Sequence, residues 1–215
     1  SFFVGFIYGE NSAGAGSIKG DFALLWRNLQ IFLNNDIVTA LNFTNDLDSG
    51  YKSSRTPLLY ILHAYLNPFV EDKVFFVRSV FVISVTGPII FYFCLKQKFK
   101  GHDDLLLILV SSILFLSPYF RTSSYWGLEE NFGLITLLLS FIFLSKFLSN
   151  NISWKNYYLL FLTTFLSSLC LYFDQKLCII PLICFFQIYF SKKSKNLKIL
   201  LFIFYFIFSL PYLYL

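Results

Sequence analysis

The amino-acid sequence predicts an all-α protein built as a bundle of transmembrane helices. Hydrophobic residues make up 57% of the 215 residues and charged residues only 13%, and the mean hydropathy is +0.66. A soluble protein could not bury that much apolar surface without exposing large hydrophobic patches. Long apolar runs separated by short polar turns are instead typical of a protein that crosses a membrane several times.

The lysines support this fold class because they gather in alternate turns of the predicted bundle. By the positive-inside rule, those turns face the cytoplasm. The net charge of +5 comes from these lysines, which would meet anionic lipid head groups. Because the lysines are divided among separate short turns, they do not indicate nucleic-acid binding. The clusters are Lys96, Lys98 and Lys100, then Lys146 and Lys155, then Lys192, Lys193, Lys195 and Lys198.

Residues 1–8 are predicted to form the outer end of a first span, and residues 9–73 an outer loop with interfacial helices. Residues 9–20 are rich in glycine and serine and should be irregular. Asp21 can cap a helix that continues to about Asn34 and lies at the membrane interface. Residues 35–56 are polar again, and a short helix over 57–69 has Pro57 at its first turn. The apolar face of the first helix is Phe22, Leu25, Trp26, Leu29 and Phe32.

Residues 74–215 are predicted to hold about six further spans. The expected ranges are 74–95, 104–120, 128–148, 156–173, 177–190 and a last span from residue 197. The segment RTSSYWG, residues 121–127, is expected to be an outer loop. Both ends lie in apolar runs and methionine is absent from the sequence. We therefore expect residues 1–215 to be one membrane domain of a longer chain whose C-terminal part is missing.

Charged residues gather at three helix mouths on the predicted non-cytoplasmic side. Charges at a membrane boundary are costly, so they indicate a functional site. An arginine there suits a phosphate group, because the guanidinium fork matches its oxygens; the alternative for Arg121 is to reach lipid head groups. The candidates are Glu10, Asp21 and Arg55 in the first loop, Arg121, Glu129 and Glu130 around the second, and Asp174 and Lys176 in the third.

Glu129 and Glu130 are the most informative pair, because both open an apolar helix. Acids at a helix start also stabilise the positive end of the helix dipole, which is the purely structural alternative. Adjacent residues point in different directions on a helix, so at most one of the two should face the site. Asp174 and Lys176 could likewise simply pair with each other.

The sequence gives no sign of several other kinds of chemistry. The four cysteines lie in apolar segments without a CxxC pair, and the two histidines lack metal-ligand spacing. The sequence contains no phosphate-binding glycine loop, no dinucleotide fingerprint and no nucleophile elbow.

Three segments between Tyr51 and Leu148 carry a resemblance to a known family. SSRTPLLYILHAYLNPF closes the outer loop, and FVRSVFVISVTGPIIFYFCLKQKF follows with Arg78 near its outer end. ILVSSILFLSPYFRTSSYWGLEENFGLITLLLSFIFLSK then joins a span ending in Ser-Pro to a span opened by an acid. In this order, the segments resemble the multi-span polyprenol-phosphate-sugar glycosyltransferases of the GT-C superfamily, in its protein-mannosyltransferase and aminoarabinose-transferase-like branch.

The resemblance implies a sugar donor carried on a polyprenyl phosphate and an acceptor that is a lipid, a glycan or a protein. The acceptor hydroxyl would attack the anomeric carbon with inversion, while a carboxylate removes its proton as general base. Basic side chains would stabilise the phosphate leaving group. No divalent metal would be obligatory, because the lipid leaving group is already a phosphomonoester. No cofactor is expected either, since the lipid-linked sugar is a co-substrate. The site would face the periplasm from a bacterial inner membrane.

The roles implied for individual residues leave the base open. Members of the family place an Asp, often Asp-Glu, directly after the first span, whereas this chain has Tyr8-Gly9-Glu10 there. The base is therefore either Glu10 or Asp21. The phosphate would be held by Arg121, Arg55 or Lys176, and the sugar or acceptor oriented by Glu129 or Asp174.

A transporter or lipid flippase is the main alternative, because such proteins also carry charges at helix mouths. Transporters usually hold ionisable groups near the membrane midplane and contain repeated halves. This sequence has almost no charge at the span centres and no internal repeat. A structural subunit of a membrane complex is a third interpretation that composition does not exclude.

Overall fold

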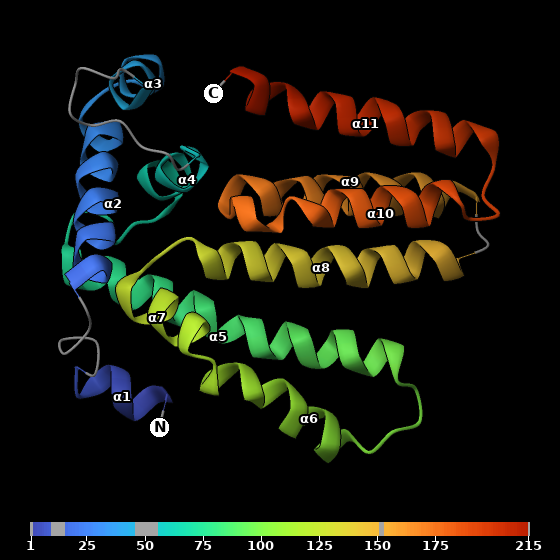
Figure 1. The fold of residues 1–215 in the computed structure, drawn as a ribbon, viewed down its shortest axis with the longest axis horizontal. Coiled ribbons are helices and arrows are strands. Elements are labelled where there is room, and N and C mark those ends of the chain that lie inside the picture. The colour runs from blue at the N-terminus through green and yellow to red at the C-terminus, as the bar shows by residue number, and fades with distance from the viewer. Residues whose placement is uncertain (1, 10–15, 46–55, 151–152, 215) are drawn as a thin grey trace. The chain divides into compact units, whose positions relative to one another are not determined.

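The computed structural model describes residues 2–9, 16–45, 56–150 and 153–214 (Figure 1). Helices account for 84% of the structure and no strand occurs within these ranges, which confirms the all-α prediction. In the described ranges, three helices are long and apolar enough to cross a membrane: α5 (Lys73–Lys98), α8 (Glu130–Ser149) and α9 (Ser153–Phe173). A fourth crossing results if residues 104–116 and 118–126, which are joined by a sharp bend, form one span.

The chain divides into two compact units, and α5 continues from one into the other. Unit 1 comprises residues 1–85 and 114–131, and unit 2 comprises residues 86–113 and 132–215. Pro88 lies inside α5, just beyond the division. Because proline has no backbone N–H, the carbonyl of Ser84 lacks the helical donor that residue 88 would normally supply.

Four short or medium helices precede α5 in the described part of unit 1. These are α1 (Phe2–Ile7), α2 (Gly16–Asn34), α3 (Ile37–Asn45) and α4 (Leu58–Leu66). The 3-10 turn η2 (Ile113–Leu116) and helix α7 (Pro118–Trp126) return the chain to this unit.

Helix α2 begins at Gly16, five residues earlier than predicted. Asp21 therefore lies in its second turn and not at its N-cap, so the predicted capping role of Asp21 was wrong. The predicted apolar stripe is nevertheless present, because Phe22, Leu25, Leu29 and Phe32 are all buried. The stripe faces protein: the Phe22 ring lies 6.0 Å from Trp126, and the Phe32 ring lies 5.7 Å from Tyr60.

Helix α3 occupies part of a segment that the sequence pattern assigned to a polar loop. Asp36 caps its first turn, since its carboxylate accepts hydrogen bonds from Thr39 Oγ1 at 2.7 Å and Thr39 N at 3.1 Å. These bonds favour the ionised form and hold the pKa of Asp36 below its ordinary value. The hydrophobic pattern alone did not reveal a helix whose start depends on a cap.

Helix α4 begins directly after Pro57 and carries a buried histidine. His63 is only 4% exposed, and its ring lies edge-on to Phe76 at 4.8 Å. Asn67 Nδ2 approaches His63 Nδ1 at 3.0 Å, and because the amide nitrogen is a donor, Nδ1 must accept. This bond requires a neutral ring, and burial lowers the pKa of His63 to about 4.

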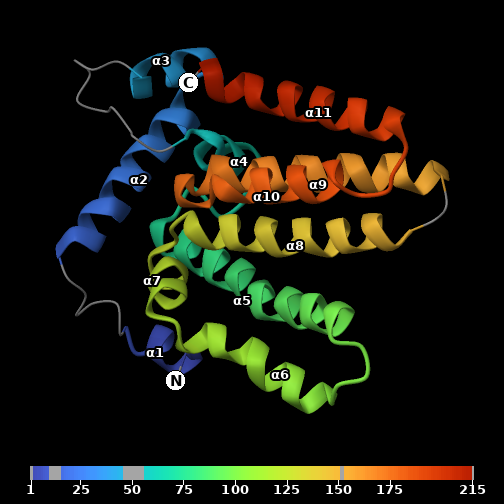
Figure 2. The same cartoon turned by 45° about the vertical axis from the view of Figure 1, so that its right-hand side comes forward.

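Unit 2 is formed by the second part of α5, α6 (Asp104–Ser112), α8, α9, the 3-10 turn η3 (Gln175–Leu177), α10 (Ile179–Tyr189) and α11 (Lys195–Tyr214). Helices α8 to α11 lie side by side (Figures 1 and 2). Tyrosines tie α11 to α9: Tyr172 OH donates to the Phe208 carbonyl at 2.7 Å, and Ser167 Oγ lies 2.9 Å from Tyr205 OH. The buried core is Leu144, Phe147, Leu160, Cys170, Ile180, Cys184, Ile188, Leu197 and Leu201.

Hydroxyl side chains in the apolar helices of unit 2 bond to their own backbone. Thr163 and Thr164 on α9 donate to the carbonyls four residues earlier at 2.8 and 2.9 Å, and Ser140 on α8 donates to Leu137 O at 2.7 Å. All three side chains are fully buried. The hydroxyl groups are thus satisfied within one helix, which lets a polar residue occupy an apolar span.

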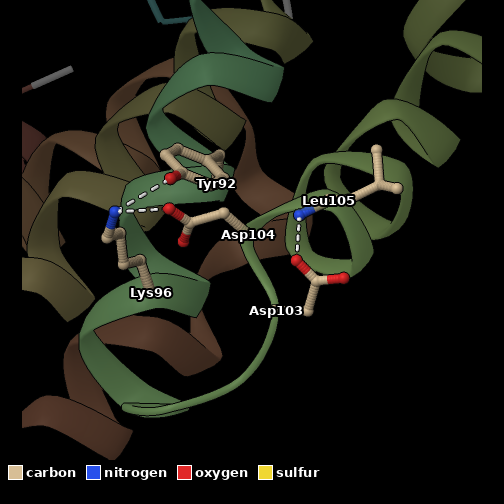
Figure 3. Close-up of polar contacts among 5 residues, drawn as sticks. All are labelled: Tyr92, Lys96, Asp103, Asp104 and Leu105. Carbon is tan, nitrogen blue, oxygen red and sulfur yellow. Dashed lines mark hydrogen bonds and ion pairs between the residues drawn. The ribbon is translucent and has the colours of Figure 1, made fainter.

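One end of unit 2 carries all of its lysines except Lys176. There α5, α8 and α10 end and α6, α9 and α11 begin (Figure 1), and we call it the lysine-rich end. Lys96 Nζ lies 3.0 Å from Asp104 Oδ2 and 3.1 Å from Tyr92 OH, while Asp103 caps α6 by accepting from Leu105 N at 3.1 Å (Figure 3). The alternating helix directions agree with the predicted turns of unit 2. That this end faces the cytoplasm stays a prediction.

The predicted bounds agree with the structure for α5, α8 and α9 to within a few residues. The region after residue 104 differs. Helix α6 ends at Ser112, and α7 occupies most of the segment RTSSYWG, so the predicted outer loop at 121–127 was wrong. The cause is local, because Ser117 caps a new helix whose first residue is Pro118.

The first prediction concerns Gly133, where α8 meets the far end of α9. A Cβ atom here would lie 3.0 Å from Leu177 Cδ1 and 3.2 Å from Asp174 Cβ, whereas one at Gly20 of α2 would meet nothing within 4 Å. We expect Gly133→Val to lower the free energy of unfolding by about 1–3 kcal/mol through overpacking. Gly20→Val is the matched control and should not lower it. Thermal unfolding in mild detergent measures both, and equal midpoints would contradict the close contact.

The second prediction concerns the pH dependence of stability. The folded-state pKa of His63 is about 4, below the ordinary value of 6.5, so between these values the unfolded chain binds more protons. The contribution of neutral His63 to the free energy of unfolding is therefore fully present above pH 6.5 and is lost as the pH falls toward 4. We expect His63→Leu to flatten this dependence by up to about 1.4 kcal/mol per pH unit. His102→Gln, at an exposed histidine, should leave the slope of unfolding midpoint against pH unchanged.

Candidate functional site at the corner between α7 and α8

The candidate site begins with a sharp turn that joins α7 to α8. Gly127 ends α7 with φ 66° and ψ 35°, a left-handed conformation that favours glycine. An added Cβ would also lie 3.1 Å from the ring of Phe76. Leu128 N donates to Ser123 O at 2.9 Å and closes the turn. This geometry brings the acids at positions 129 and 130 to the start of α8.

Asn131 is the residue that holds this corner together. It is 1% exposed, and its Nδ2 lies within hydrogen-bond distance of three oxygens. These are Ser124 Oγ at 2.7 Å, Phe120 O at 3.1 Å and Ser84 Oγ of α5 at 3.1 Å. One buried amide therefore connects α5, α7 and α8 within unit 1.

Glu130 is joined to the same corner through a serine. Ser123 Oγ lies 3.2 Å from Glu130 Oε2 and 3.2 Å from the Leu128 carbonyl, and it accepts a hydrogen bond from Asn131 N at 3.2 Å. The single hydroxyl proton is shared between the two acceptors. The carboxylate of Glu130 is thereby positioned, although its side chain is only half-buried.

Glu129 and Arg121 give the corner its charge. Glu129 is 7% exposed and lies between Leu128, which is also buried, and Glu130. Arg121 is half-buried, and its guanidinium carbon lies 5.7 Å from the centre of the Tyr125 ring. Tyr125 OH in turn donates to Phe2 O at 2.6 Å, which fixes the ring that Arg121 covers. A guanidinium suits an anion because its planar fork of donors matches the oxygens of a carboxylate or phosphate.

Asp21 is the first-loop candidate that the structure describes near this corner. Its side chain is exposed, and the next residue, Phe22, packs its ring 6.0 Å from Trp126 of α7. Asp21 therefore belongs to the end of α2 that contacts α7. Glu10 and Arg55, the other first-loop candidates, lie outside the described residues.

Asp174 and Lys176 belong to unit 2, at the turn between α9 and α10. Asp174 is half-buried and caps η3, because its Oδ1 accepts a hydrogen bond from Lys176 N at 3.0 Å. Lys176 is exposed. Asp174 and Lys176 are thus in contact through the lysine backbone N–H. Their role in substrate binding stays a prediction.

Sequence reasoning missed Ser84, Ser123 and Asn131. Asn131 had a usable signal, since an amide in an apolar span is costly unless it finds partners. Its partner Ser84 is 47 residues away along the chain, and no spacing rule connects them. Within the described residues, His, Cys, Asp and Glu side chains form no group of three that could hold a metal ion.

The third prediction tests the corner directly. Asn131→Leu keeps the approximate volume but removes the donor to Ser84, Phe120 and Ser124. Ser124 Oγ still donates to Phe120 O at 2.8 Å, so the loss falls on Ser84 Oγ, and a buried polar group left unsatisfied costs about 1–3 kcal/mol. We expect a clear loss of stability by thermal unfolding in detergent. Asn42→Leu, at an exposed asparagine of α3, is the control and should change stability little. Comparable losses in both variants would mean that the amide network contributes nothing specific.

Comparison of the chain with protein-family models, curated proteins and solved structures gave no match. A function must therefore be argued from the chemistry of the corner and from the pattern of the sequence.

Proposed function

We propose that this protein is a membrane glycosyltransferase that moves a sugar from a polyprenyl-phosphate donor to a lipid, glycan or protein acceptor on the non-cytoplasmic face. The observation that carries the proposal is the corner between α7 and α8. There a guanidinium on an aromatic ring, two carboxylates and a buried amide network occur together at the start of an apolar helix. The resemblance of residues 51–148 to GT-C glycosyltransferases supports the same reaction class.

The reaction would be a displacement at the anomeric carbon. The acceptor oxygen forms a bond to that carbon as the bond to the phosphate oxygen breaks, and the bonding electrons leave with the phosphate. A carboxylate takes the acceptor proton. Asp21 suits this role because it lies on the end of α2 that contacts α7, and Glu10 is the alternative.

Arg121 would stabilise the charge that develops on the leaving phosphate. Its guanidinium carbon lies 5.7 Å from the centre of the Tyr125 ring, and a planar guanidinium can donate paired hydrogen bonds to phosphate oxygens. Glu129 or Glu130 would accept hydrogen bonds from sugar hydroxyls, and Glu130 is already oriented by Ser123. Arg55, Asp174 and Lys176 remain further substrate-binding candidates.

The fourth prediction concerns activity. Purified protein in nanodiscs is incubated with radiolabelled polyprenyl-phosphate sugars and membrane extract, and the loss of label from the donor lipid is followed. We expect Arg121→Ala to slow transfer by about 10²–10³-fold, as removal of a transition-state anion donor does. Arg27→Ala, at an exposed arginine of α2, should leave the rate unchanged.

The carboxylates are tested in the same assay. Loss of transfer in Asp21→Asn with activity retained in Glu10→Gln assigns the base to Asp21, and the reverse pattern assigns it to Glu10. Glu71→Gln, at an exposed acid before α5, is the control. Absence of donor-dependent transfer by folded protein overturns the proposal, and protein-dependent lipid flux in vesicles would then favour a transporter.

A further inference from the structure

The lysine-rich end of unit 2 contains a cavity of about 380 Å³ that the proposed reaction does not use. It lies where α8 and α10 end and α9 and α11 begin. Leu148 and Leu197 form its apolar part. Its polar lining is Asn150, Asn156, Ser191, Lys192, Lys193 and Ser194.

Lys193 is held in this cavity by the protein. Its Nζ donates a hydrogen bond to the Asn150 carbonyl and lies 5.2 Å from the centre of the Phe147 ring. Partial burial lowers the pKa of Lys193. Asn150 Nδ2 also donates to Asn156 Oδ1 at 3.0 Å, so the polar wall has a defined arrangement.

The positive charge here is not balanced by nearby acids. Between Asn131 and Leu215 the sequence contains a single carboxylate, Asp174, which lies at the other end of α9, about 30 Å along that helix. The acids at the start of α6 have other partners: Asp104 pairs with Lys96, and Asp103 caps the helix (Figure 3). A cavity lined by two lysines and no carboxylate therefore suits an anion.

Two features indicate that this anion belongs to a membrane lipid. First, exposed aromatic residues surround the lysine-rich end, as at a membrane–water interface; Trp154, Tyr158 and Tyr189 are 69%, 60% and 40% exposed. Second, a larger cavity of about 530 Å³ also borders Leu148; Phe141, Ile142 and Leu144 of α8 give it an apolar wall, and Lys98 adds a further cation. An acyl chain could pack against this apolar wall while its phosphate lies beside Lys193.

We propose that this cavity binds the phosphate head group of an anionic glycerophospholipid, with Lys192 and Lys193 as the cationic contacts and Asn150 and Asn156 as polar neighbours. Lipid bound there would bridge the ends of α8 and α10 and the starts of α9 and α11. The inference stands apart from the proposed transferase reaction and does not depend on it.

The fifth prediction is read by native mass spectrometry of the delipidated full chain. Phosphatidylglycerol and phosphatidylcholine with identical acyl chains are compared as ligands. We expect phosphatidylglycerol to be retained more strongly, and Lys193→Gln and Lys192→Gln each to weaken its binding about fivefold. Lys195→Gln removes the same charge at an exposed residue outside the cavity and should have little effect.

Each outcome of this experiment decides the proposal. Lys192 is exposed, so its variant tests the site even if Lys193→Gln fails to fold. Equal losses in all three lysine variants would indicate diffuse attraction and overturn a defined site. Equal retention of both lipids would overturn the requirement for an anion. Displacement of the lipid by an equal concentration of inorganic phosphate would make the cavity a free-phosphate site instead.

Discussion

The structure depends on one constraint: a polar group buried among apolar helices must find its partner within the protein, because lipid offers none. The amide nitrogen of Asn131 satisfies this constraint at the corner between α7 and α8, where it meets one backbone carbonyl and two serine hydroxyls, whereas its buried amide oxygen has no hydrogen-bond partner among the described residues. The turn at Gly127 makes these contacts attainable. The charged side chains of the corner take their positions from that buried network.

Unit 2 meets the same constraint differently. Thr163 and Thr164 donate their hydroxyl protons to carbonyls of their own helix, so neither hydroxyl needs a partner on a neighbouring helix. Tyr172 instead crosses to a carbonyl of α11. Side chains that bond within one helix leave its packing to van der Waals contact, whereas the tyrosine fixes one helix against another.

The candidate spans α5, α8 and α9 could be predicted from the sequence because crossing a membrane requires a long, continuous apolar run. Such a run can be recognised in a single stretch of sequence. Helix α7 could not be predicted, since its start depends on the Ser117 cap and its burial on distant partners. The same is true of α3, whose start rests on Asp36. In the candidate site, the acids and Arg121 could be predicted, because charged residues at the boundary of an apolar span are energetically costly and therefore indicate a function. The network that positions Glu130 could not, because Ser84 joins it from 47 residues away.

Helix α5 carries a mechanical consequence of its proline. The division between the two units falls between residues 85 and 86, inside the turn where Pro88 deprives the Ser84 carbonyl of its helical donor. Bending the helix at this turn breaks one fewer hydrogen bond than bending it elsewhere, so thermal bending concentrates there. The hydroxyl of Ser84 is bound to Asn131 on the unit 1 side of the same turn. The turn of α5 that lacks one hydrogen bond thus directly follows the residue that the amide network holds, so the helix is anchored and weakened at neighbouring positions.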